Sequence, residues 1–284
     1  MTDHSMRGRR VINVAAFSVT AGSALLTVSV LFFLLGYIGW HGFKGVNWAF
    51  FTQLPKPVGE LGGGMANAIV GTVKLLALAS AIGIPIGFFG GIYLAEFGHN
   101  RLGFWVRYAT DLLNGVPSIV MGIFAYTLVV LPMRQFSTLA GSVALGIMMI
   151  PIAVRSTEEF LRLVPASVRE ASLALGVHAW KTILFVVIPA AFRGLLTGIL
   201  LDLARVAGET APLLFTAFNN RYFTTRLTQP ISSLTVQVFT YAISPYADWH
   251  RQAWAGALVL VLIVLLCSIL ARAATRRLES MHVH

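Results

Sequence analysis

Apolar runs long enough to cross a bilayer recur along this sequence. A transmembrane helix needs about 20 apolar residues, and six segments match or nearly match that length: Val11–Trp40, Asn67–Ala95, Leu112–Leu131, Leu139–Val154, Gly194–Phe218 and Ala253–Leu270. Only 11% of the residues are charged, less than half of the about 25% that is usual in soluble domains. So few charges could not cover the surface of a water-soluble globule. The chain is therefore predicted to be an all-α, polytopic membrane protein with one membrane domain.

The distribution of lysine and arginine between the predicted loops indicates the orientation in the membrane. Loops on one side hold about twice as many basic residues as loops on the other, and basic residues collect in cytoplasmic loops. We therefore expect both termini and the loop 155–193 to lie in the cytoplasm. The expected organisation is a cytoplasmic tail of residues 1–10, a six-helix transmembrane domain of residues 11–274 and a cytoplasmic tail of residues 275–284.

Several classes of protein are excluded by what the sequence lacks. The net charge is +10, but the basic residues lie between apolar blocks and form no stripe for nucleic acid. Cys267 is the single cysteine, so the chain has no intramolecular disulfide framework and no thiolate metal cluster. No P-loop motif GxxxxGK[ST] is present, and no predicted span carries a histidine that could serve an intramembrane enzyme. We expect no enzymatic activity, metal or cofactor in this chain.

The loop between the fourth and fifth spans has the pattern of a helical hairpin. Pro165 can open a short helix, and Gly176 stands where a left-handed C-terminal cap belongs. A second helix is predicted from about Ala179 to a break at Ile188–Pro189, before the fifth span. Two interpretations are open: an amphipathic hairpin at the membrane surface, or a docking element for a soluble partner.

Residues of this loop resemble the EAA signature of ABC-importer permeases. The match consists of Glu170, Ala171, Ser172 and Gly176, followed by Val186–Pro189 at the family's spacing. Serine replaces the second alanine of the family pattern, and Val and Ile replace its Ile and Leu. The resemblance implies a type I ABC-importer permease bundle with a cytoplasmic coupling loop at about 165–189, and the first short helix of that loop would be the coupling helix. These four residues would then couple the permease to a nucleotide-binding subunit.

Further stretches resemble PstA, the permease family of phosphate-specific ABC importers. They are GGGMANAIVGT (62–72), GIYLAEFG (91–98), PSIVMGIFAY (117–126), ARVAGETAPLLFTA (204–217) and QPISSLTVQVF (229–239). The resemblance implies a permease subunit in a bacterial inner or plasma membrane that moves inorganic phosphate along a path shared with a second, PstC-like permease. Two copies of a PstB-like subunit would bind ATP and Mg, and a PstS-like phosphate-binding protein would deliver the substrate. An importer for phosphonate, sulfate or molybdate is the alternative, whereas a passive channel would leave the docking loop unexplained.

Three charged residues lie inside the fifth predicted span. Asp202, Arg205 and Glu209 are spaced i, i+3 and i+7, which predicts one helix face near the middle of the bilayer. A charge there costs on the order of 2.5–3.5 kcal/mol, so such residues face the bundle interior or a wet path. The three either brace helices together or line an oxyanion route, where the Arg205 guanidinium matches phosphate geometry. Lys74 of the second span is expected to extend to the outer interface.

Overall fold

The computed structural model describes the backbone of residues 3–60 and 62–280, and all of that part is helix or loop without a strand. The expected all-α class is confirmed. Five helical runs are long and apolar enough to cross a membrane, and a bent pair makes a sixth span when its two arms are taken together. The five are Ile12–Phe43, Ala66–Glu96, Thr138–Arg162, Ala179–Ala207 and Ala247–Ile269, and the bent pair joins Arg101–Gly115 to Ser118–Met133.

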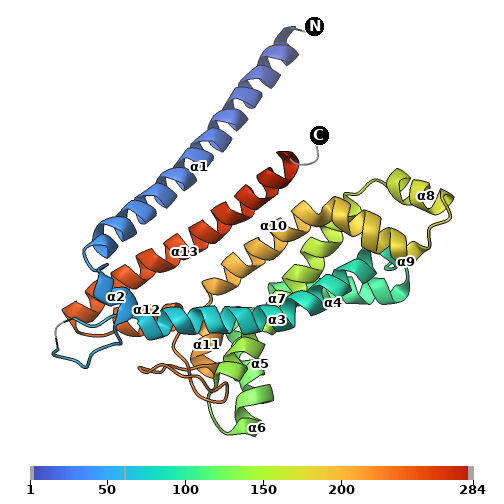
Figure 1. Ribbon diagram of the computed structural model, residues 1–284. Coiled ribbons are helices and arrows are strands. Elements are labelled where there is room, and N and C mark those ends of the chain that lie inside the picture. The colour runs from blue at the N-terminus through green and yellow to red at the C-terminus, as the bar shows by residue number, and fades with distance from the viewer. Residues whose placement is uncertain (1–2, 61, 281–284) are drawn as a thin grey trace.

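The helices follow one another along the chain in the order drawn in Figure 1. The first half contains α1 (Asp3–Phe43), α2 (Trp48–Thr52), α3 (Ala66–Glu96), α4 (Arg101–Gly115), α5 (Ser118–Ala125), η1 (Tyr126–Val130), α6 (Leu131–Met133) and α7 (Thr138–Arg162). The second half contains α8 (Ala166–Ala174), α9 (Ala179–Thr182), η2 (Ile183–Val187), α10 (Ile188–Ala207), α11 (Ala211–Thr216), α12 (Leu234–Ala242) and α13 (Ala247–Ser280). The elements η1 and η2 are π-helical turns.

Small residues let α3 and α7 form the most extensive helix pair in the described part of the chain. Gly83, Gly87 and Gly91 follow one another at four-residue intervals and face α7. A Cβ atom at Gly87 would lie 2.4 Å from Cβ of Ala153, and one at Gly91 would lie 2.4 Å from Cβ of Thr157. Glycine at these positions allows the two backbones to approach closely, as in small-residue interfaces between transmembrane helices.

Helix α1 lies at the edge of the molecule beside α13 (Figure 1). None of the residues in its most apolar window is buried. Contact with α13 is close at the C-terminal end of α1, where a Cβ atom at Gly42 would lie 2.7 Å from the carbonyl oxygen of Trp254. The remaining apolar surface of α1 is left to lipid or to another subunit.

Two predicted spans contain helix breaks. The third prediction, Leu112–Leu131, includes the junction of α4 and α5, where the helix direction changes by 105°. Val116 has extended dihedral angles of −72° and 130°, because the ring of Pro117 disfavours a helical residue before it. The fifth prediction, Gly194–Phe218, includes the end of α10 at Ala207 and continues through the short α11. Apolar composition alone therefore predicted continuous spans where the backbone turns.

The predicted helix break at Ile188–Pro189 is wrong. Helical residues run without interruption from Ala179 to Ala207 through α9, η2 and α10. Pro189 lacks an N–H, and in a regular α-helix its ring clashes with the carbonyl four residues earlier. The π-helical turn η2 widens the helix directly before this proline, and such π-bulges take up the strain without ending the helix.

The ends of the bundle differ in structure. Helix α8, the start of α1 and the end of α13 lie at one end, and loop 219–233 lies at the other (Figure 1). This loop is tied to α3: Nδ2 of Asn67 donates to the carbonyl oxygen of Asn220 at 2.6 Å. Lys74 extends toward the same end, and its Nζ donates to the carbonyl oxygen of Thr224 at 2.6 Å.

Candidate functional site

Helix α8 has the ends that its sequence predicts. It begins after Pro165 and ends with Gly176 at a φ of +80°. The N–H of Gly176 donates to the carbonyl of Leu173 at 2.9 Å, and the N–H of Val177 donates to that of Ser172 at 3.3 Å. These two bonds form a Schellman motif, which requires a left-handed residue such as glycine. The expected left-handed cap is confirmed, as is the second helix that begins at Ala179.

Two side chains of α8 fix it to the bundle. Arg169 donates to Oε1 of Glu96 at 2.7 Å, at the end of α3, and to the carbonyl of Leu161 at 2.8 Å, at the end of α7. Ser172 is buried, and its hydroxyl lies 2.8 Å from that of Thr182 in α9. Ser172 therefore acts within the chain, by holding α8 against the next helix.

The outer face of α8 is left free by these attachments. Glu170, Ala171 and Gly176 are exposed, and the side chains of Leu173 and Leu175 are 48% and 84% exposed. An exposed carboxylate among leucines, on a helix held rigidly from behind, is a surface on which a soluble protein can dock.

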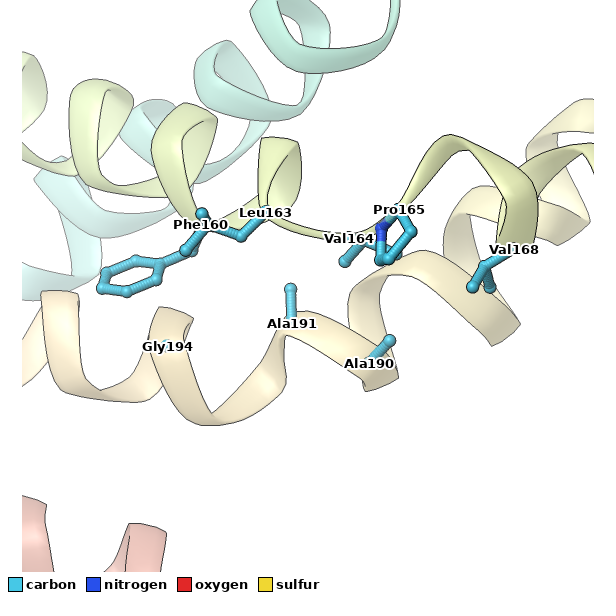
Figure 2. Close-up of a pocket in the computed structure, with 8 residues that line it drawn as sticks. All are labelled: Phe160, Leu163, Val164, Pro165, Val168, Ala190, Ala191 and Gly194. Atoms are coloured by element: carbon cyan, nitrogen blue, oxygen red, sulfur yellow. The ribbon is translucent and has the colours of Figure 1, made fainter.

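An apolar pocket of about 380 Å³ lies beside this helix. Figure 2 shows it between the end of α7, the start of α8 and the start of α10. Its lining contains only apolar residues and glycine: Phe160, Leu163, Val164, Pro165, Val168, Ala190, Ala191 and Gly194. With no polar side chain to orient a ligand, the pocket is a packing gap between the loop and the bundle.

A second candidate site surrounds Arg205, near the end of α10. Arg205 and Glu209 line one shallow pocket together with residues of α4, α5, α7 and the α4–α5 junction; we call it the Arg205 pocket, and its other lining residues are Leu113, Asn114, Val116, Met121, Met148, Pro151, Ile152 and Val206. Arg205 is exposed and Glu209 is half-buried. A guanidinium and a carboxylate open to one pocket can contact a partly protonated oxyanion.

The structure does not form the expected three-residue face. Helix α10 ends at Ala207, so Glu209 lies beyond it, and the backbone carbonyl of Glu209 accepts a hydrogen bond from Thr235 Oγ1 at 2.9 Å. Asp202 is 1% exposed, and neither carboxylate oxygen has a hydrogen-bond partner. Among the described residues, no ion pair within 4.0 Å links Arg205 to Asp202 or Glu209.

The sequence reasoning missed a charge cluster at the α8 end of the bundle. Glu158 of α7 is 1% exposed and contacts three arginines: Arg107 Nε at 2.6 Å, Arg162 Nη2 at 2.8 Å and Arg155 Nη1 at 3.4 Å. Two of the arginines stand three residues before and four after Glu158, a helical spacing visible in the sequence. The third arginine, Arg107, comes from α4, and its contact with Glu158 is not visible in the sequence spacing. In the part of the chain described here, no group of three or more His, Cys, Asp or Glu residues has a metal-binding arrangement.

Comparison with known proteins identifies the family. The model of the "Binding-protein-dependent transport system inner membrane component" family matches residues 83–280. A "Phosphate transport system permease protein PstA" of Yersinia pestis is 45% identical over 265 residues, covering 93% of this chain and 90% of that protein. A protein described as PstA from Xylella fastidiosa (strain Temecula1) is 44% identical, covering 97% of this chain and 96% of that protein. One described as PstA 1 from Mycobacterium tuberculosis (strain H37Rv) is 34% identical, covering 95% of this chain and 90% of that protein.

Solved structures with the same fold come from ABC importers. A chain of the MetNI methionine ABC transporter in an inward-facing conformation has a TM-score of 0.63 and 19% identity, covering 75% of this chain and 96% of that chain. A chain of a bacterial ABC transporter for import of the acidic polysaccharide alginate has a TM-score of 0.64 and 12% identity, with coverage of 89% and 94%. This chain therefore belongs to the binding-protein-dependent transport system inner membrane components, and within them to the PstA family of permeases.

Proposed function

We propose that this chain is the transmembrane permease subunit of an ATP-driven importer for inorganic phosphate, and that it forms the translocation path with a second permease subunit. The observation that carries the proposal is the 45% identity to a phosphate transport permease over 93% of the chain. The exposed guanidinium in the Arg205 pocket supports the same substrate. A guanidinium keeps its charge at every relevant pH and offers paired donors that match phosphate oxygens.

The outer face of α8 is the proposed docking surface for two copies of an ATP-binding subunit, one on this chain and one on the second permease. Glu170 and Ala171 contact the partner in this proposal, while Ser172 and Gly176 set the position and the turn of the helix. ATP and Mg belong to that partner, and the chain itself acts as a permease without catalysing hydrolysis. A soluble phosphate-binding protein delivers the substrate to the opposite end of the bundle.

The Arg205 pocket gives a physical basis for choosing phosphate over sulfate. At neutral pH phosphate still carries a proton that it can donate, whereas sulfate carries none. The carboxylate of Glu209 can accept that proton in a hydrogen bond beside the guanidinium of Arg205. A sulfate in the same place would leave the carboxylate facing an anion, and such an unpaired acceptor discriminates against the wrong ligand. Asp202 lies behind this pocket in the proposal, as a buried carboxylate on the helix that carries Arg205.

The orientation completes the proposal. Helix α8 and both chain ends are placed in the cytoplasm, and loops 44–65 and 219–233 on the outside of a bacterial inner or plasma membrane. The excess of lysine and arginine in the proposed cytoplasmic loops supports this assignment. An ATP-binding partner needs cytoplasmic ATP, so the docking face and the basic loops must lie on the same side.

Reconstitution tests the proposed function. The complex that co-purifies with this chain is placed in vesicles with ATP inside and the binding protein outside, and uptake of labelled phosphate is measured. We expect ATP-dependent uptake that excess unlabelled phosphate abolishes and that sulfate, molybdate and phosphonate leave unchanged. If sulfate, molybdate or phosphonate abolished uptake of labelled phosphate, that oxyanion would be the substrate instead. Uptake without ATP would contradict the ABC-importer mechanism.

A further inference from the structure

Glu158 holds a buried negative charge at the end of the bundle that carries α8. Burying a carboxylate is costly unless it is paired, and Glu158 is paired with guanidiniums from two helices. Arg107 of α4 donates from Nε at 2.6 Å, and Arg162 of α7 lies at 2.8 Å. The contact with Arg107 joins residues 51 positions apart in the chain. Glu158 therefore fixes α4 to α7.

The same region fixes α4 and α8 to one turn of α3. Nη1 and Nη2 of Arg107 donate to the carbonyls of Gly98 and Leu94, each at 2.8 Å. Arg169 of α8 donates to the carboxylate of Glu96, which lies between those two carbonyls in the chain. Arg107 and Arg169 thus both bond to the C-terminal end of α3. A displacement of α8 is therefore transmitted through α3 to Arg107, which anchors α4.

The other end of α4 forms part of the Arg205 pocket. Leu113, Asn114 and the following Val116 line that pocket, while Arg107 lies about two turns earlier on the same helix. A helix of this length moves as a rigid element, so a shift at Arg107 also shifts Asn114. The contacts therefore run from α8, through the end of α3 and Arg107, to the wall of the pocket.

We propose that Glu158 is a positioning residue that couples docking at α8 to the shape of the Arg205 pocket. Its carboxylate holds Arg107, and Arg107 in turn holds α4 in register with α8. ATP-driven movement of α8 then changes the position of Asn114 beside Arg205 and so opens or closes the pocket. The proposal rests on the proposed phosphate-import function of the two sites that Glu158 connects.

The test measures how many phosphates are transported for each ATP hydrolysed by the complete complex in vesicles. Glu158→Gln keeps the shape of the side chain and removes its charge, and Glu159→Gln is the matched control. Glu159 is 67% exposed, and its carboxylate pairs with Arg155 alone among the described residues, at 3.8 Å. Arg107→Lys provides an independent variant, because it leaves Glu158 with a cation yet loses the forked contacts to Leu94 and Gly98.

We expect Glu158→Gln and Arg107→Lys complexes to retain the ATPase and to hydrolyse ATP, with a transported-to-hydrolysed ratio about fivefold below wild type, within the range of single-residue effects on coupling. Glu159→Gln should keep the wild-type ratio. Combining Glu158→Gln with Arg107→Lys should add no further loss, because both act through one contact.

Three results would overturn the inference. They are a wild-type ratio in Arg107→Lys, a ratio in Glu158→Gln equal to that of Glu159→Gln, and loss of uptake that only follows loss of assembled complex. If Glu158→Gln fails to assemble, Arg107→Lys alone decides. A wild-type complex that hydrolyses ATP but moves no phosphate would instead refute the proposed function, which is a separate result.

Discussion

Asp202 and Arg205 are three residues apart on α10 but differ in burial, because their side chains point in different directions around the helix axis. Three positions along an α-helix leave two side chains about 60° apart around its axis. Asp202 shares the buried face of α10 with Gly198 and Val206, whereas Arg205 is exposed in its pocket. Spacing alone predicted one face for both. The packing of α10 on α7 separates them, and it cannot be read from a single helix.

Neutralising Arg205 should abolish phosphate transport without unfolding the protein. Arg205 makes no ion pair with Asp202 or Glu209 among the described residues, although its charge interacts with the buried Asp202 carboxylate at longer range. Arg205→Gln should therefore change the free energy of unfolding by about 1 kcal/mol or less. Uptake should fall by about a hundredfold, the loss typical of a missing charged contact to a charged ligand. Arg205→Lys should recover only part of it, because lysine lacks the planar fork.

A neutral triple variant separates transport from bracing. In Asp202→Asn, Arg205→Gln, Glu209→Gln no charge is left to pair, so a purely structural triad would recover both thermal stability and uptake. We expect stability without uptake. Labelled-phosphate uptake into vesicles and thermal unfolding are measured on the same preparation, and wild-type uptake by a stable triple variant would remove Arg205 from the path.

Helices and their ends were largely predictable from local sequence. Apolar length located the five spanning helices and the bent pair, although the fifth predicted span began too late and ran past the end of α10. Pro165 and Gly176 located the ends of α8, because a helix cap depends on a few neighbouring residues. The helix break at Val116–Pro117 and the unbroken helix at Pro189 were not predictable in this way. Proline ends a helix in one case and is absorbed by the π-helical turn η2 in the other. The difference depends on the surrounding packing, as does the contact of Glu158 with Arg107.

Substitutions in α8 should separate docking from folding. Apart from its two chain neighbours, no heavy atom of the described residues lies within 4 Å of a Cβ placed on Gly176. The backbone φ of +80° is therefore the main obstacle to a side chain there. Left-handed backbone costs about 1–2 kcal/mol for ordinary residues, and asparagine tolerates it best. Gly176→Val should therefore release the ATPase from the purified permease, and Gly176→Asn should keep most of it bound.

Charge reversal at the exposed Glu170 gives a second test of the same surface. Glu170→Lys should also lose the ATPase, at unchanged thermal stability of the permease, since the side chain is exposed and forms no hydrogen bond or ion pair with the described residues. Retention of the ATPase in detergent is measured against expression level. Wild-type retention in both Gly176→Val and Glu170→Lys would show that α8 is not the docking helix.

For the whole molecule, the two ends of the bundle suit different partners. The end with α8 also holds the start of α1 and the end of α13 (Figure 1), and four of its arginines pair with Glu158 or Glu96. The opposite end is formed by loops that are hydrogen-bonded into the helices, such as the contact of Lys74 with Thr224. If the ATPase docks on α8 as proposed, the α8 end faces the cytoplasm, and the start of α1 and the end of α13 lie on the same side.

Cysteine labelling checks this orientation in intact cells. In a Cys267→Ser background, single cysteines replace four exposed residues: Glu60, Gln135 and Thr225 at one end, and Ser167 on α8 at the other. A membrane-impermeant maleimide should label the first three and leave Ser167→Cys unlabelled until the cells are permeabilised. All four positions are exposed in this chain, and labelling of Ser167→Cys after permeabilisation shows that its missing label in sealed cells reports the side of the membrane and not cover by the ATPase. Labelling of Ser167→Cys in sealed cells would reverse the orientation, and with it the placement of the ATPase on α8.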